Sequence, residues 1–158
     1  MKRFFFFLIL SILPTAAWGK GCYSPQEVAA ENVLRLHSEM MVIAVTCRQS
    51  SYGHDLIAAH TRWTQRFIED IKKAEAIMIN YYKKTRGGDG IAQLDDLRTK
   101  LANEFGQKSA DEKPPVFCAY RRDNVMALYN SPALSAWDTA MRLYEGAPTF
   151  DPICLKRP

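Results

Sequence analysis

An amphipathic pattern covers the stretch from Ser24 to Arg48 and predicts a central helix. Large apolar residues recur there three and four positions apart, as on one helical face: Val33, Leu36, Met40, Ile43 and Cys47. Others widen this stripe, so most sides of the helix should be buried: Leu34, Met41 and Val45. Ser24, Pro25 and Glu27 form a helix-start signature. We therefore expect the rest of the chain to pack around this helix.

The same spacing predicts one further helix from about Asp55 to Lys84. Its inner face should be formed by residues three or four apart: Ile57, His60, Trp63, Phe67, Ile71, Ala74, Met78 and Tyr81. A glycine-rich loop then ends the helix, and Asp89 can cap the next one. That third helix should extend to about Lys108 on a narrow stripe: Ile91, Leu94, Leu97, Leu101 and Phe105.

The remaining pattern predicts two shorter helices. The first should cover Val116 to Tyr129, with Phe117, Tyr120, Val125 and Leu128 as inner residues. Ser131 and Pro132 then resemble a helix start, followed by Leu134, Trp137, Met141 and Tyr144 at helical spacing. No strand alternation is present in the sequence. The pattern therefore predicts an all-α fold, a small antiparallel bundle of four to five helices.

The amino-terminal pattern differs and predicts a secretory signal peptide. Lys2 and Arg3 precede an apolar run, after which Pro14 and small residues follow. Cleavage after Gly19 would leave residues 20–158 as a single helical domain, periplasmic or secreted. The apolar run is shorter than the roughly 20 residues that a membrane-spanning helix needs, and an uncleaved anchor is the alternative.

Export changes the meaning of the four cysteines, which are Cys22, Cys47, Cys118 and Cys154. An even number in an exported chain indicates disulfides, and no pair has the CxxC spacing of redox or zinc sites. Lipid modification of Cys22 is an alternative that the preceding residues disfavour, because no apolar residue stands where one is expected. Two structural bridges are the preferred interpretation.

Helix geometry selects among the three possible cysteine pairings. Cys22 and Cys47 flank a predicted helix of roughly 24 residues, which would separate them by roughly 35 Å, whereas a disulfide needs about 7 Å or less. In an antiparallel bundle the fourth helix begins beside the end of the first, and the tail can return to the base. We therefore predict the disulfides Cys47–Cys118 and Cys22–Cys154.

The net charge and composition of the chain exclude few classes of binding partner. The formal net charge of the chain is +4, and the predicted cleavage removes the charges of Lys2 and Arg3. Mild charge and export together argue against a nucleic-acid partner. A basic, aromatic helix end is explained by the helix dipole, and alternatively forms a small anion-binding surface: Tyr82, Lys83, Lys84 and Arg86.

The other polar residues are better explained by structural roles than by catalysis or metal binding. Glu31, Arg35 and Glu39 are four apart and predict an ion-pair ladder on a solvated strip. His37 should be partly buried, and it cannot form an acid–base pair with Glu39, because residues two apart diverge on a helix. His54 and His60 lack the spacing of a helical zinc site. We predict no bound metal and no organic cofactor.

Motifs of nucleophilic catalysis are absent from the sequence, since there is no GxSxG and paired cysteines leave no free thiolate. Carboxylates for glycoside hydrolysis could still converge in space, and the first to inspect are Glu31, Glu39, Glu69 and Asp70. The sequence favours a non-enzymatic binding or accessory factor of the cell envelope, with an envelope protein or anionic component as partner. The alternatives are a small hydrolase of cell-wall glycan and a carrier of an apolar ligand, held between Met40, Met41, Met78, Trp63 and Phe67.

Overall fold

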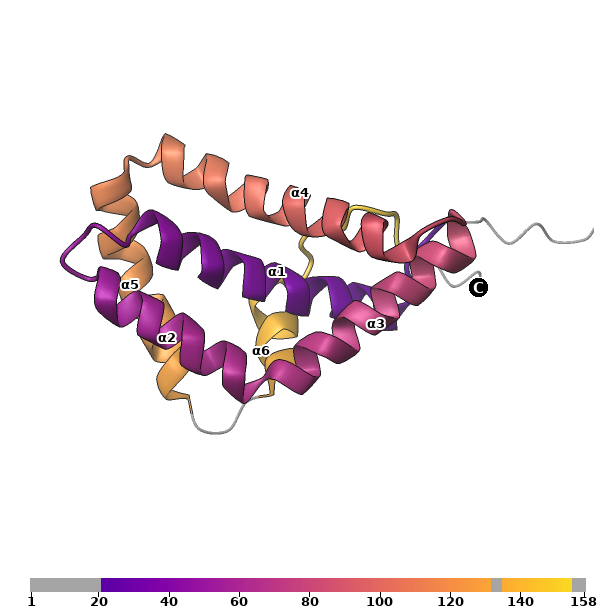
Figure 1. The fold of residues 1–158 in the computed structure, drawn as a ribbon, viewed down its shortest axis with the longest axis horizontal. Helices are drawn as coiled ribbons and strands as arrows, with labels where there is room; N and C mark the ends of the chain where they lie inside the picture. Colours follow the sequence, from indigo (N-terminus) through magenta and orange to yellow (C-terminus); the bar gives the residue numbers. More distant parts are fainter. Residues whose placement is uncertain (1–20, 132–134, 155–158) are drawn as a thin grey trace, which may run out of the picture.

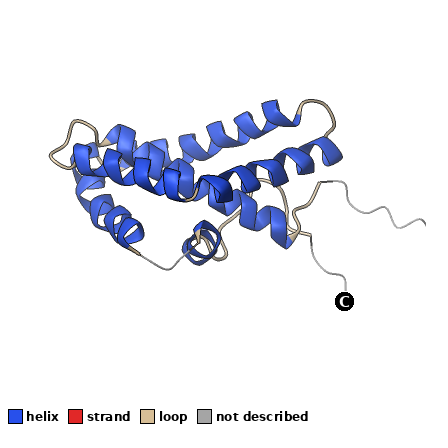
Figure 2. Cartoon of the chain, turned by 60° about the horizontal axis from the view of Figure 1, so that its bottom comes forward, coloured by secondary structure: helices blue, strands red, loops and turns tan. Residues whose placement is uncertain are grey.

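The computed structural model describes residues 21–131 and 135–154. Within these ranges the chain forms helices and no strand (Figures 1 and 2). The helices are α1 (Pro25–Thr46), α2 (Gly53–Arg66), α3 (Ile68–Thr85), α4 (Gly90–Asp111), α5 (Pro114–Asn130) and α6 (Ala136–Leu143). The all-α prediction is therefore confirmed, although the described residues form one helix more than the four to five expected. The predicted signal peptide, residues 1–19, lies outside the described residues.

The central position of α1 follows from its sequence. Ser24 is its N-cap, Pro25 occupies the first turn, and the Ser24 backbone N–H donates to the Glu27 carboxylate over 2.8 Å. The middle of the helix, residues 30–36, is buried on all sides. Met41 and Val45 do not follow the prediction that they widen the buried stripe, since 37% and 59% of their surfaces are exposed. The neighbouring helices therefore leave one side of the second half of α1 open.

The single helix predicted from Asp55 to Lys84 is divided at Phe67 into α2 and α3. Phe67 has backbone angles φ −111° and ψ 23°, and no glycine or proline is involved. The bend is a tertiary effect. Asp70, in the first turn of α3, accepts hydrogen bonds from the backbone N–H of Ala136 and from Trp137 Nε1, each over 3.1 Å. The docking of α6 against this turn coincides with the change of direction.

The shorter helices differ in detail from their predictions. α6 begins after Ser135, whose side chain accepts a hydrogen bond from the Asp138 backbone N–H, and not after Ser131. Leu134, predicted for this helix, lies outside the described residues. Several residues predicted to face inward are exposed because their helices bury only one narrow side: Ile57, Ile91, Tyr120 and Met141.

Two disulfides join distant parts of the chain, with the pairing predicted from helix geometry. The Cα atoms are 5.0 Å apart in Cys22–Cys154 and 5.5 Å apart in Cys47–Cys118. Figure 1 shows the reason: α1 runs one way, α2 and α3 return together, and α4 again follows α1. α5 therefore begins beside the end of α1. None of the helices in the described ranges combines the length and apolar character needed to cross a membrane.

Candidate functional site

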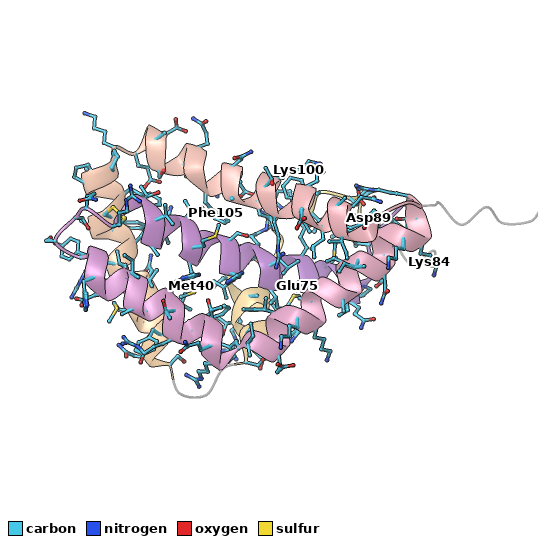
Figure 3. All side chains as sticks on the ribbon, viewed as in Figure 1. Met40, Glu75, Lys84, Asp89, Lys100 and Phe105 are labelled. Carbon is cyan, nitrogen blue, oxygen red and sulfur yellow. A yellow bond between two sulfur atoms is a disulfide. The ribbon has the colours of Figure 1, made fainter. Side chains whose placement is uncertain are left out.

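A cleft of about 590 Å³ opens between α1, α4, α5 and α6. Its walls are mostly apolar, with Leu36, Met40 and Ile43 from α1 and Phe105 from α4. Figure 3 shows Met40 and Phe105 in the half of the molecule that contains α5. The remaining lining residues are Glu39, Lys108, Arg121, Asn124, Val125, Ala127, Leu128, Ser131, Leu143 and Tyr144. We call this site the α5 cleft.

Local sequence explains the walls of the α5 cleft. Leu36, Met40 and Ile43 are spaced by four and three, so α1 presents them on one face. Across the cleft, α5 presents Val125 and Leu128 in the same way. α5 buries few residues along its length, namely Phe117, Cys118 and Val125. The Cys47–Cys118 disulfide holds its beginning to the end of α1, while its second half borders the cleft.

A closed polar network lies in the wall of the α5 cleft. Arg121 Nη1 donates to Glu39 Oε1 over 3.1 Å, and the Tyr144 hydroxyl donates to Glu39 Oε2. Arg121 Nη2 also lies 3.5 Å from a Glu112 carboxylate oxygen. Burial, with the neighbouring Glu39 carboxylate, raises the pKa of Tyr144 above its usual range. Tyr144 therefore stays protonated and donates to Glu39 at physiological pH.

The second cation of the α5 cleft is also compensated. Lys108 Nζ lies 3.1 Å from Glu104 Oε1, one helical turn away on α4. The same ammonium group lies 4.7 Å from the centre of the Phe105 ring. Among the lining residues, each cation thus has a carboxylate partner. The α5 cleft therefore combines apolar walls with charges that are already paired.

At the other end of α1, a buried network fixes the tail of the chain. Glu31 is fully buried and pairs with Arg35 over 2.9 Å. Arg35 also donates to the Pro148 carbonyl over 3.1 Å, and the Phe150 backbone N–H donates to Glu31 over 3.3 Å. Burial raises the pKa of Glu31, and its hydrogen bond from Arg35 opposes this shift. The predicted solvated strip is therefore wrong here, because the tail covers it.

Asp151 continues this network to α3. It accepts a hydrogen bond from the Tyr81 hydroxyl over 2.8 Å and binds Arg86 through both carboxylate oxygens, each over 2.7 Å. Next to it, Tyr23 exchanges backbone hydrogen bonds with the tail, to the Pro152 carbonyl over 2.7 Å and from Cys154 over 2.8 Å. We call this set the tail clamp: Glu31, Arg35, Tyr81, Arg86 and Asp151.

The residues predicted as an anion-binding surface share the end of α3 but differ in burial and in their partners. Tyr82 is buried, with its hydroxyl 3.2 Å from that of Tyr23. Arg86 belongs to the tail clamp, while Lys83 and Lys84 are exposed at the end of α3 opposite to α5 (Figure 3). A second cleft, of about 560 Å³, includes Lys84 but also the carboxylate of Glu27 in its lining.

The histidines show no metal-binding arrangement. His37 and His60 stack with ring centres 5.5 Å apart, which fits the predicted burial of both. Burial lowers the pKa of His37 to about 4, helped by His60 and Arg98, and burial also lowers the pKa of His60. His54 is almost fully exposed. In the described part of the chain, no three His, Cys, Asp or Glu side chains are grouped so as to hold a metal ion.

The four candidate carboxylates are also separated. Glu31 belongs to the tail clamp, Glu69 is exposed and paired with Lys72, and Asp70 caps α6. Glu39 alone borders the α5 cleft, as the single carboxylate among its lining residues. An acid and a base for glycoside hydrolysis would need a second carboxyl group there. The lining residues therefore give the hydrolase hypothesis no support.

Sequence reasoning did not locate the α5 cleft. Of the residues proposed for an apolar carrier, only Met40 lines it, and Met40 is a buried core residue like Trp63 and Met78. The sequence does not indicate that Arg121 and Tyr144 belong to a site with Glu39. They contact Glu39 only through tertiary packing, at sequence separations of 82 and 105. No protein-family model, curated protein or solved structure matches the chain.

Proposed function

We propose that the protein is an exported, non-enzymatic binding protein whose ligand occupies the α5 cleft. The observation that carries this proposal is the cleft itself, about 590 Å³ in volume with mostly apolar walls. Sites for small molecules typically have about 300–1,000 Å³, apolar linings and a few polar groups. Three polar residues of this lining, Glu39, Arg121 and Tyr144, hydrogen-bond to one another, and Lys108 pairs with Glu104.

Export to the periplasm or the cell exterior is part of the same proposal. Support comes from the positive, apolar and small-residue regions at positions 1–19 and from the disulfides Cys22–Cys154 and Cys47–Cys118. Amino-terminal sequencing of the mature protein should begin at Lys20. An intact Met1 on protein recovered from the cytoplasm would contradict export.

Binding is tested with N-phenyl-1-naphthylamine, an uncharged apolar probe whose fluorescence rises on leaving water. We expect saturable binding of one probe per chain. Ala127 lines the α5 cleft on α5, so Ala127→Trp should fill the cleft and weaken probe binding by at least about tenfold. Ala119 is exposed on the same helix and does not line the cleft, so Ala119→Trp is the matched control and should bind normally.

Two outcomes would overturn the binding site. If the wild-type chain binds no probe, the proposed function loses its support. If Ala127→Trp and Ala119→Trp bind equally well, the probe occupies another place. Circular dichroism of both variants controls for folding, since both substitutions lie on the same exposed helix.

A further inference from the structure

We infer that the α5 cleft selects uncharged apolar ligands and excludes anions of the same shape. This inference rests on the proposed function, because it specifies the ligand of the same site. Its basis is the arrangement of charge in the wall. The lining contains the cations Lys108 and Arg121, which suggests an anion site at first sight, but each is already neutralised by carboxylates of the chain.

The pairing of Arg121 is the decisive feature. Its Nη1 atom donates to Glu39, its Nη2 atom lies near Glu112, and the guanidinium lies 5.3 Å from the Phe117 ring centre. Both Glu39 oxygens are in turn occupied, one by Arg121 and one by Tyr144. The remaining donor of Arg121, Nε, has no hydrogen-bond partner but is buried, so it offers no exposed N–H to an anion in solution.

A charged ligand would therefore have to break this network or remain unpaired. Only 17% of the Glu39 side chain and 20% of the Arg121 side chain are exposed. An anion that took Arg121 from Glu39 would leave a mostly buried carboxylate without its cation, which is strongly unfavourable. An anion placed against the apolar walls would lose water without gaining a partner. An uncharged ligand neither separates the Arg121–Glu39 pair nor brings an unpaired charge out of water.

The dimensions of the cleft indicate a compact ligand. Its α1 wall extends from Leu36 to Ile43, roughly 10 Å, and its α5 wall from Arg121 to Ser131, roughly 15 Å, at the rise of an α-helix. Asn124 is exposed at the edge and can exchange a hydrogen bond with a neutral hydroxyl or carbonyl group. The geometry thus fits a molecule of a few rings, or a short branched chain, with at most a neutral polar group.

The test compares N-phenyl-1-naphthylamine with 8-anilinonaphthalene-1-sulfonate, which share their rings and differ by one sulfonate. The uncharged probe should bind at least about tenfold more tightly at the site blocked by Ala127→Trp, because the sulfonate finds no free cation there. Only fluorescence lost in that variant is counted, since the sulfonated probe also binds loosely packed apolar surfaces.

Glu39→Gln tests the cause of the selectivity. The substitution keeps the shape of the side chain and removes the nearer of the two carboxylates beside Arg121, so the affinity ratio of uncharged to sulfonated probe should fall by about tenfold. Glu69→Gln removes an exposed carboxylate elsewhere and should leave the ratio as it is.

Each result separates this inference from the proposed function. If neither probe binds in the cleft, both are overturned. If the two probes bind the cleft equally, or the sulfonated probe binds more tightly, the binding function stands and the charge selectivity is wrong. If Glu39→Gln leaves the ratio unchanged, the paired Arg121 charge is not the source of the selectivity, and the inference fails in that form.

Discussion

Glu31 and Glu39 lie about two turns apart on α1, each paired with an arginine, yet their surroundings differ completely. Glu31 is sealed by the tail, whose backbone at Pro148 and Phe150 completes the hydrogen bonds of the Glu31–Arg35 pair. Glu39 borders an open apolar cleft. The same pair of residue types thus holds the fold together in one place and sets the charge of a cleft wall in the other.

The comparison shows that the environment decides the role of an ion pair. In the tail clamp, the Glu31–Arg35 pair is almost fully buried, so loss of either partner would leave an unpaired charge inside the protein. In the α5 cleft, 17% of the Glu39 side chain is exposed and Tyr144 also donates to it, so loss of the Arg121 cation should cost less than loss of Arg35 in the tail clamp. The largest consequences for stability are therefore expected at the tail clamp and its disulfide.

The largest loss of stability should follow removal of the Cys22–Cys154 disulfide. It closes a loop with a sequence separation of 132, so replacing both cysteines by serine should lower the free energy of unfolding by about 5 kcal/mol in the chain-entropy treatment. Urea unfolding monitored by circular dichroism measures this change. A loss below about 2 kcal/mol would show that the hydrogen bonds of the tail clamp hold the tail without the bridge.

The next largest loss of stability should follow substitution of Arg35 in the tail clamp, and substitution of Arg121 in the α5 cleft should cost less. Arg35→Met strands the buried Glu31 carboxylate and should cost about 3–5 kcal/mol, since removing one partner of a buried pair leaves an uncompensated charge. Arg121→Met is the matched comparison in the α5 cleft and should cost less, about 1–2 kcal/mol, because the pair is partly exposed and Tyr144 still donates to Glu39. Equal losses in urea unfolding would contradict the distinction between the two regions.

The smallest of the three main effects on stability should come from lowering the pH, through the stacked side chains of His37 and His60 between α1 and α2. The groups around it are Arg98 of α4 and its partner Glu75 of α3. His37 has a pKa of about 4 in the fold, below its usual 6.5. Only the unfolded chain therefore takes up this proton as the pH falls from 6.5 towards 4, and stability should fall in that window, on the order of 2–3 kcal/mol.

A double variant isolates the histidine contribution, because carboxylates titrate near the same range. His37→Gln with His60→Gln should flatten the dependence of unfolding free energy on pH between 6.5 and 4. Urea unfolding at a series of pH values measures both proteins. If the two profiles are parallel throughout, the stacked histidines do not control the acid response.

Sequence patterns predict those parts of the molecule that are governed by local geometry. The start of α1 follows from Ser24, Pro25 and Glu27, which satisfy the first backbone groups of the helix. The pairing of Cys47 with Cys118 follows from helix length and direction, which exclude a bridge across α1. Both depend on residues close in sequence or on simple helix dimensions.

What sequence patterns miss depends on contacts between distant segments. The spacing of Glu31 and Arg35 predicts their pairing but not their burial, which residues 148–151 bring about from the other end of the chain. The helix break at Phe67 interrupts a regular apolar pattern at the point where α6 docks on Asp70. Leu36, Ile43 and Leu128 have the spacing of core residues, and no periodicity distinguishes a wall facing a cleft from one facing another helix.

The meeting of Tyr23 with the tail, locked by Cys22–Cys154, also determines how the molecule responds to mechanical force. A pull on the chain segments outside these cysteines passes through the covalent bridge and bypasses the helices between them. The tension is then carried by two residues and a sulfur–sulfur bond, so α1 to α6 stay unstretched while that bond is intact. Reduction would transfer the tension to the tail, and the hydrogen bonds of Tyr23 and Asp151 would be the first to carry it.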